Sequence, residues 1–193
     1  VQIEPKSLPR DIELATRARE DSAKAGLTYD DDLFLNFVLS PRLHLEPWSP
    51  WRVQLHSWLE RFTPQPLDRK MSTVRARIDG LAVLPPTLFG PPLTPSQVLE
   101  GGVCSTSLDK AVLGTAALRC LGVPARCAAD FGGVEYYDGK EWQFWDMTGA
   151  PPAKGSLHVL GKDPLPLKDF GVARIEDGHL RALDDLPWEK ILG

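Results

Sequence analysis

Cys104 is the residue of this sequence best placed to act as a nucleophile. It follows Gly101, Gly102 and Val103 and precedes an apolar run. We therefore predict that it opens a helix, where the positive end of the helix dipole favours a thiolate. The two glycines permit close approach of backbone or substrate. A single cysteine near a helix start is also typical of a structural residue, so the thiol by itself leaves both roles open.

A cysteine nucleophile needs a base that holds it as thiolate and a donor that protonates the leaving group. The sequence has four histidines, and none lies between Cys104 and Asp146. His158, in a short strand-like run, and His44, in a loop bounded by prolines, are the two that could reach the site from outside that interval. The other two are predicted to be solvated surface residues: His56 and His179.

Three helices are predicted to cover this site from the N-terminal side. The first runs from Ser7 to Gly26, with Leu8, Ile12 and Ala15 on one shared side. The second and third are amphipathic segments with apolar residues at helical spacing, at 30–39 and 50–62.

A loop between the second and third helices carries an arginine and a glutamate four residues apart, Arg42 and Glu46. Pro41 and Pro47 prevent a helix here. One interpretation is a surface turn with an Arg–Glu pair. The other is a loop that lines a cleft and binds substrate, because loops held by rigid helices often carry binding groups.

The second half of the chain changes from helix to strands. After the helix that begins at Cys104 and ends near Gly122, a strand is predicted at 126–131, and a hairpin at 134–146 turns at Asp138–Gly139. A second hairpin is predicted around Asp177–Gly178. Helices first and strands later indicate an α+β fold, with helices packed on an antiparallel sheet.

Two segments resemble the transglutaminase-like family of papain-related cysteine domains. Gly102–Cys104, a helix of small and apolar residues, and Leu-Arg-Cys-Leu-Gly-Val-Pro-Ala-Arg at 118–126 resemble the family pattern G-x-C followed by L-R-x-L-G-[IV]-P-A-R. Residues 134–148 are similar to the family's strand pair V-E-V-Y-x-x-G-x-W-x-x-x-D-P-T. The close resemblance covers roughly 94–148.

The resemblance implies a transglutaminase-like, papain-like fold in which a central helix packs on an antiparallel sheet. It predicts one domain over 1–193, with a helical N-terminal part at 1–93, the Cys-helix and strand core at 94–148, and C-terminal strands and loops at 149–193. Cys104 takes the nucleophile position, and Asp146 takes that of the aspartate that orients the catalytic histidine. Phe131–Gly133 stand where the family has that histidine.

Two functional interpretations follow from this departure. The missing histidine favours a catalytically degraded domain that binds a peptide, amide or glycan ligand or forms part of a larger protein, because loss of a triad member costs several orders of magnitude in rate. The retained Cys104 and Asp146 favour an active cysteine-dependent amide hydrolase or acyl transferase, with His158 or His44 as the base.

Composition and motifs limit the partners. A net charge of -4 provides no electrostatic case for nucleic acid, and no run of about 18 apolar residues predicts a membrane span. No cofactor is expected, because the sequence lacks the glycine-rich nucleotide-binding strings. The three cysteines have no short pair spacing, so no metal site is predicted, and their odd number leaves the compartment open.

Overall fold

The computed structural model of the chain describes residues 8–44, 46, 49–83, 93–129, 132–147, 173–176 and 179–182. The chain divides into two compact units, Val1–Thr148 and Gly149–Gly193. The described part of the first unit contains six α-helices and a three-stranded antiparallel sheet. The predicted α+β class is therefore confirmed at this level.

The three predicted N-terminal helices are all present. Two of them end in a different helical form, since α2 continues as the π-helix η1 and α3 as the 3-10 helix η2. Asp30 caps α2, its carboxylate accepting a hydrogen bond from the Leu33 amide at 2.8 Å. The elements are α1 (Leu8–Lys24), α2 (Asp31–Phe34), η1 (Leu35–Leu39), α3 (Trp51–Leu59) and η2 (Glu60–Phe62).

The buried face of α1 differs from the predicted one. Leu8 and Ile12 are exposed, at 42% and 43%, whereas Ala18 and Ser22 are buried. Small residues face the core because the backbone of α1 approaches Gly122 so closely that a Cβ there would lie 2.2 Å from the Ala18 carbonyl oxygen. Of the three predicted residues only Ala15 is buried, and the large apolar residue on the buried face is Leu14.

Two helices were not predicted from the sequence, α4 (Leu67–Asp79) and α5 (Pro95–Gly101). The start of α5 does carry a recognisable signal, a capping box in which Thr94 and Gln97 exchange hydrogen bonds, with Pro95 in the first turn. α4 follows Pro66 and also carries a signal, since Leu67, Met71, Val74 and Ile78 recur at helical spacing.

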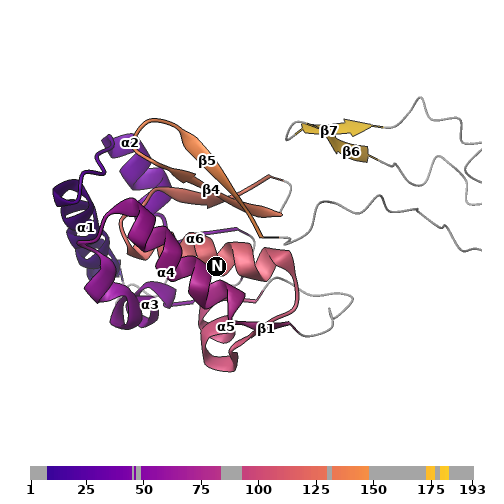
Figure 1. Ribbon diagram of the computed structural model, residues 1–193, viewed down its shortest axis with the longest axis horizontal. Helices are drawn as coiled ribbons and strands as arrows, with labels where there is room; N and C mark the ends of the chain where they lie inside the picture. Colours follow the sequence, from indigo (N-terminus) through magenta and orange to yellow (C-terminus); the bar gives the residue numbers. More distant parts are fainter. Residues whose placement is uncertain are drawn as a thin grey trace, which may run out of the picture. The chain divides into compact units, whose positions relative to one another are not determined.

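The helix α6 (Ser107–Cys120) is the centre of the first unit. Eleven of its residues are buried, so it is apolar or tightly packed on all sides rather than on one stripe. The sheet packs on one side of it, and α3, α4 and α5 surround the rest (Figure 1). This arrangement agrees with the predicted central buried helix.

The sheet has the order β3-β4-β5, with antiparallel pairing throughout. Its hairpin turns at Asp138–Gly139 as predicted, where Gly139 has a φ of 103°. A short parallel pair, β1 with β2, joins Val83 to Cys104 in register. The strands are β1 (Ala82–Val83), β2 (Val103–Cys104), β3 (Ala125–Cys127), β4 (Gly133–Tyr137) and β5 (Trp142–Asp146).

The described part of the second unit is one antiparallel hairpin, β6 (Ala173–Glu176) with β7 (His179–Ala182). It matches the second predicted hairpin. The turn residues themselves, Asp177 and Gly178, lie outside the described residues.

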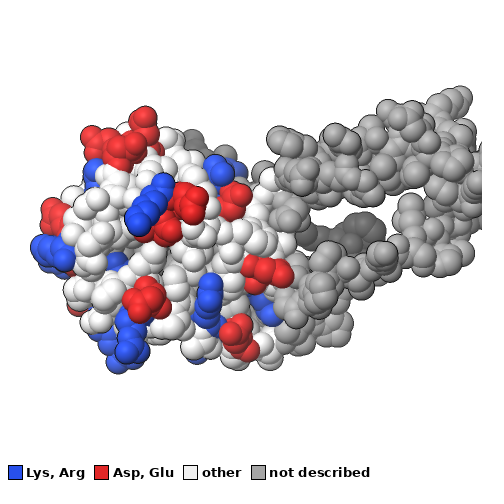
Figure 2. All heavy atoms as spheres, turned by 45° about the horizontal axis from the view of Figure 1, so that its top comes forward, with Lys and Arg blue, Asp and Glu red and all other residues white. Residues whose placement is uncertain are grey.

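Acidic and basic side chains are interspersed over the face shown in Figure 2. In the described part of the chain, no helix combines the length and the apolar character that a bilayer crossing requires.

Candidate functional site

Cys104 lies in strand β2 and does not open a helix. The helix α6 begins at Ser107, after Thr106 as its N-cap. The predicted placement was therefore wrong by about one helical turn. The physical reason is that Cys104 is in extended backbone, paired with β1, before the capping turn starts.

The Cys104 thiol is fully buried, at 0% exposure. Its Sγ donates a hydrogen bond to the Ala82 carbonyl oxygen at 3.7 Å, so the proton has a defined acceptor. Burial raises the pKa of the thiol, while the charge of Lys110 lowers it and that of Asp109 raises it. The expected thiolate-favouring environment is thus contradicted, because desolvation outweighs the cationic neighbour.

Asp109 holds the segment that follows Cys104. Its carboxylate accepts hydrogen bonds from the backbone amides of Leu93 (2.8 Å), Ser105 (2.9 Å) and Thr106 (3.0 Å). The Thr106 hydroxyl in turn accepts from the Asp109 amide at 3.1 Å, which completes a capping box. Asp109 was not predicted from the sequence, although Thr106 followed three positions later by an acidic residue is a typical signal for a helix start.

Asp146 lies at the end of β5, opposite Gly133 on β4. Its side chain is exposed. The neighbouring backbone is held by a hydrogen bond from the Met147 amide to the Gly132 carbonyl oxygen at 2.8 Å. Gly132 and Gly133, two of the three residues that the resemblance aligns with the family's histidine position, therefore contribute backbone next to the end of β5. Phe131, the third, lies outside the described residues. The role predicted for Asp146 stays a prediction.

The loop with Arg42 and Glu46 is fixed by backbone contacts. The buried Glu46 carboxylate accepts from the amides of Leu43 (3.1 Å) and His44 (2.7 Å). Arg119 of α6, also buried, donates from Nη1 to the carbonyl oxygens of Ser40 and Arg42, both at 2.8 Å.

These contacts assign Glu46 to holding its own loop together. The Arg42 side chain is exposed, and these two residues form no ion pair with each other. Substrate contact by Arg42 stays a prediction. Sequence analysis did not identify Arg119 as the anchor of this loop, because the loop is 77 residues away from it in the chain.

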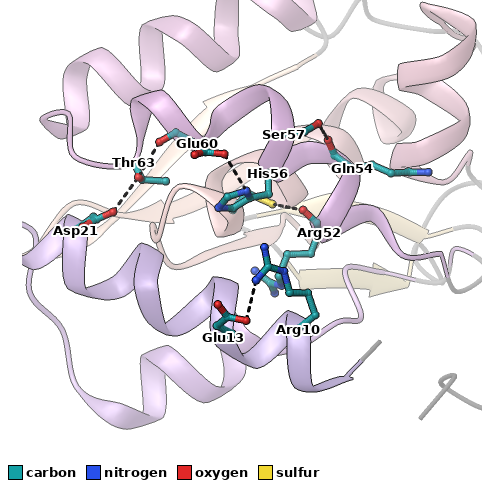
Figure 3. Close-up of polar contacts among 10 residues, drawn as sticks. Arg10, Glu13, Asp21, Arg52, Gln54, His56, Ser57, Glu60 and Thr63 are labelled. Atoms are coloured by element: carbon teal, nitrogen blue, oxygen red, sulfur yellow. Dashed lines mark hydrogen bonds and ion pairs between the residues drawn. The ribbon is translucent and has the colours of Figure 1, made fainter. Parts of the chain in front are cut away.

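His56 was predicted to be solvated, but its side chain is only 13% exposed. It lies between α1 and α3, with Nδ1 3.7 Å from the Glu60 carboxylate (Figure 3). Burial lowers its pKa, as do Arg10 and Arg17 of α1, while Glu60 and Glu13 raise it. His56 therefore belongs to the packing of α1 on α3.

The two histidines predicted as possible bases are His44 and His158. His44 is half-buried in the loop described above, and its amide donates to Glu46. His158, the other predicted base, lies outside the described residues. Neither assignment is tested by the geometry.

The remaining cysteines do not extend the site. Cys120 is buried in α6 and donates to the Arg52 carbonyl oxygen at 3.7 Å, and burial raises its pKa to about 12. Cys127 is partly exposed, with Sγ 3.5 Å from the Thr115 hydroxyl. Among the described residues, no group of three or more His, Cys, Asp and Glu side chains could hold a metal ion.

A groove of about 770 Å³ lies between α4 and the β4–β5 hairpin. It falls within the range of about 300–1,000 Å³ typical of ligand pockets. It faces the turn end of the hairpin, the opposite end of β4 and β5 from Gly133 and Asp146. Its lining residues are Leu67, Asp68, Met71, Ser72, Arg75, Tyr136, Asp138, Lys140 and Gln143.

Comparisons of the chain with protein-family models, with curated proteins and with solved structures found no match. The class of protein that the structure defines is therefore an α+β domain built around a central buried helix.

Proposed function

We propose that this chain is a transglutaminase-like domain that has lost catalysis and serves as a binding domain, by itself or within a larger protein. The observation that carries the proposal is the state of Cys104, the residue in the nucleophile position. Its thiol is fully buried, donates to a backbone carbonyl, and has a pKa raised by burial.

Each of these features opposes nucleophilic chemistry. A thiol must reach its substrate and ionise near neutral pH, and desolvation acts against both. The sequence also provides no histidine at the family's position, so general acid assistance to a leaving group is missing there. The helix dipole that would compensate is one turn away, since α6 begins at Ser107.

Other features support the transglutaminase-like scaffold. A central helix that packs on a three-stranded antiparallel sheet, with the aspartate at the end of the third strand, is what the resemblance predicts. The Pro124 to Arg126 part of the family motif leads into β3, and Arg119 of the same motif anchors an N-terminal loop and donates to the Ala125 carbonyl oxygen at 2.8 Å. These roles are structural, so they would outlast loss of activity.

The test is a turnover assay on the whole chain. A glutamine-containing peptide and a small primary amine are supplied together, ammonia release and amine incorporation are measured, and Cys104→Ala is the matched control. We expect no turnover above that control. Iodoacetamide should label the partly exposed Cys127 before the buried Cys104.

Turnover that disappears in Cys104→Ala would overturn the proposal. The active-enzyme alternative further predicts that turnover is lost in His44→Ala or His158→Ala, because one of these side chains would then be the base.

A further inference from the structure

We infer that the groove between α4 and the β4–β5 hairpin binds an extended peptide segment that carries one basic and one acidic side chain. This inference deepens the proposed binding function and rests on it. The groove is separate in the fold from the positions of Cys104 and Asp146, which the resemblance assigns to catalysis.

Arg75 binds the acidic side chain of the peptide. Its guanidinium carbon lies over the indole of Trp145 on β5, 5.3 Å from the ring centroid, a cation–π contact that restricts the orientation of the side chain. Among the described residues, no hydrogen bond or ion pair occupies its N–H groups. A planar guanidinium held in this way matches the two oxygens of a carboxylate.

Asp68 binds the basic side chain of the peptide. It lies in the first turn of α4, seven residues before Arg75, and also lines the groove. Within the described part of the chain, its carboxylate has no basic partner. Seven residues of helix span about 10.5 Å, and an extended peptide covers this length in about three residues. Side chains alternate between the two faces of an extended chain, so a basic and an acidic residue four positions apart lie on the same face and would reach both ends.

Asp138, the other acidic group of the lining, is used by the hairpin itself. Asp138 accepts hydrogen bonds from the amides of Lys140 (2.8 Å) and Glu141 (3.0 Å) and from Gln143 Nε2 (2.9 Å). The Tyr136 hydroxyl has no hydrogen bond among the described residues, which leaves it for a peptide group of the ligand. Leu67 and Met71 supply apolar contact along α4.

The lining favours a peptide over other ligand classes. Two acidic and two basic side chains, Asp68 and Asp138 with Arg75 and Lys140, leave the groove without net charge, which argues against nucleic acid. Tyr136 is the one aromatic residue of the lining, so a stacking platform for sugars is lacking.

The test is a titration of the whole chain with a nine-residue peptide that has one lysine and one glutamate, four positions apart and so on one face of the extended chain, in an otherwise Ala/Ser sequence. We expect saturable binding. Arg75→Gln should weaken it about tenfold, as should glutamine in place of the peptide's glutamate, and the two changes together should be no worse than either one. Asp68→Asn should show the same coupling with the peptide's lysine.

Matched controls lie on the same helix. Arg69→Gln and Asp79→Asn change the same charges at exposed positions of α4 outside the groove, and both should leave binding unchanged. Circular dichroism checks that every variant is folded.

Three results would overturn the inference: no binding at millimolar peptide, equal losses in Arg69→Gln and Arg75→Gln, or binding of a neutral oligosaccharide in the groove in place of the peptide. If the peptide does not bind and the turnover assay is also negative, only the groove as a peptide site is rejected. If turnover that depends on Cys104 is found, the proposed loss of catalysis is rejected.

Discussion

Lys70 should make the stability of this protein depend on pH in a direction opposite to that of a salt-bridged lysine. It lies on α4 and is 1% exposed, and its ammonium donates to the Ser22 hydroxyl at 2.6 Å and to the Leu121 carbonyl oxygen at 2.9 Å. It thereby links α1, α4 and the C-terminal end of α6. Burial lowers its pKa to about 8, against a smaller opposite effect of Asp21.

The sign follows from proton binding. The unfolded chain has a lysine pKa near 10.4, so between about pH 8 and pH 10.4 the unfolded state holds a proton that the folded state has released. Stability rises with pH wherever the unfolded state binds more protons. Below pH 8 the folded protein carries the whole cost of the buried charge. A pKa displaced by roughly two and a half pH units corresponds to about 3 kcal/mol.

The perturbation is Lys70→Met, which keeps the length of the side chain and removes the charge. The Leu121 carbonyl oxygen keeps a donor, because the Ser22 hydroxyl also bonds to it at 2.9 Å. Urea unfolding of both proteins at several pH values between 7 and 10.5 measures the difference in free energy of unfolding. We expect the free energy of unfolding of the wild type to rise by about 3 kcal/mol relative to that of the variant between pH 7 and pH 10.5.

Other groups titrate in the same range, including the thiols, but they are common to both proteins and cancel in the difference. Lys140→Met, at an exposed position of the hairpin turn, is the matched control and should give a difference that does not change with pH. A flat difference for Lys70→Met as well would refute the reasoning.

Two further predictions concern the positions that bring α6 into place. Gly122→Ala should cost about 3 kcal/mol or more in urea unfolding, because Gly122 has a φ of 71° and an added Cβ would lie 2.2 Å from the Ala18 carbonyl oxygen; a loss below about 1 kcal/mol would contradict this. Asp109→Ala should cost about 2–4 kcal/mol and speed hydrogen exchange at the Ser105 and Thr106 amides, since three backbone N–H groups lose their acceptor. Asp109→Asn, which keeps one acceptor oxygen, should lose less, and equal losses in the two variants would argue against the capping role.

Much of the secondary structure could be read from local signals. Helix periodicity, the helix end near Gly122 and the Asp-Gly turn each depend on residues within a few positions of one another. The structure has the elements that they predicted, including the hairpin at Asp138–Gly139. The helix α4 was missed although its apolar residues Leu67, Met71, Val74 and Ile78 stand at helical spacing. What no local pattern could indicate is that its charged residue Lys70 is buried with them.

The environment of the candidate site could not be read in the same way. The sequence by itself determined that Cys104 follows two glycines, that the next helix is made of small and apolar residues, and that no histidine lies between Cys104 and Asp146. Only the tertiary structure decided that the thiol is closed off, because the carbonyl that accepts its proton comes from Ala82, 22 residues earlier in the chain. The Arg119 anchor and the groove beside Arg75 likewise join segments that are distant in sequence. Burial and pKa depend on such long-range neighbours, so they are properties of the packed chain rather than of any local pattern.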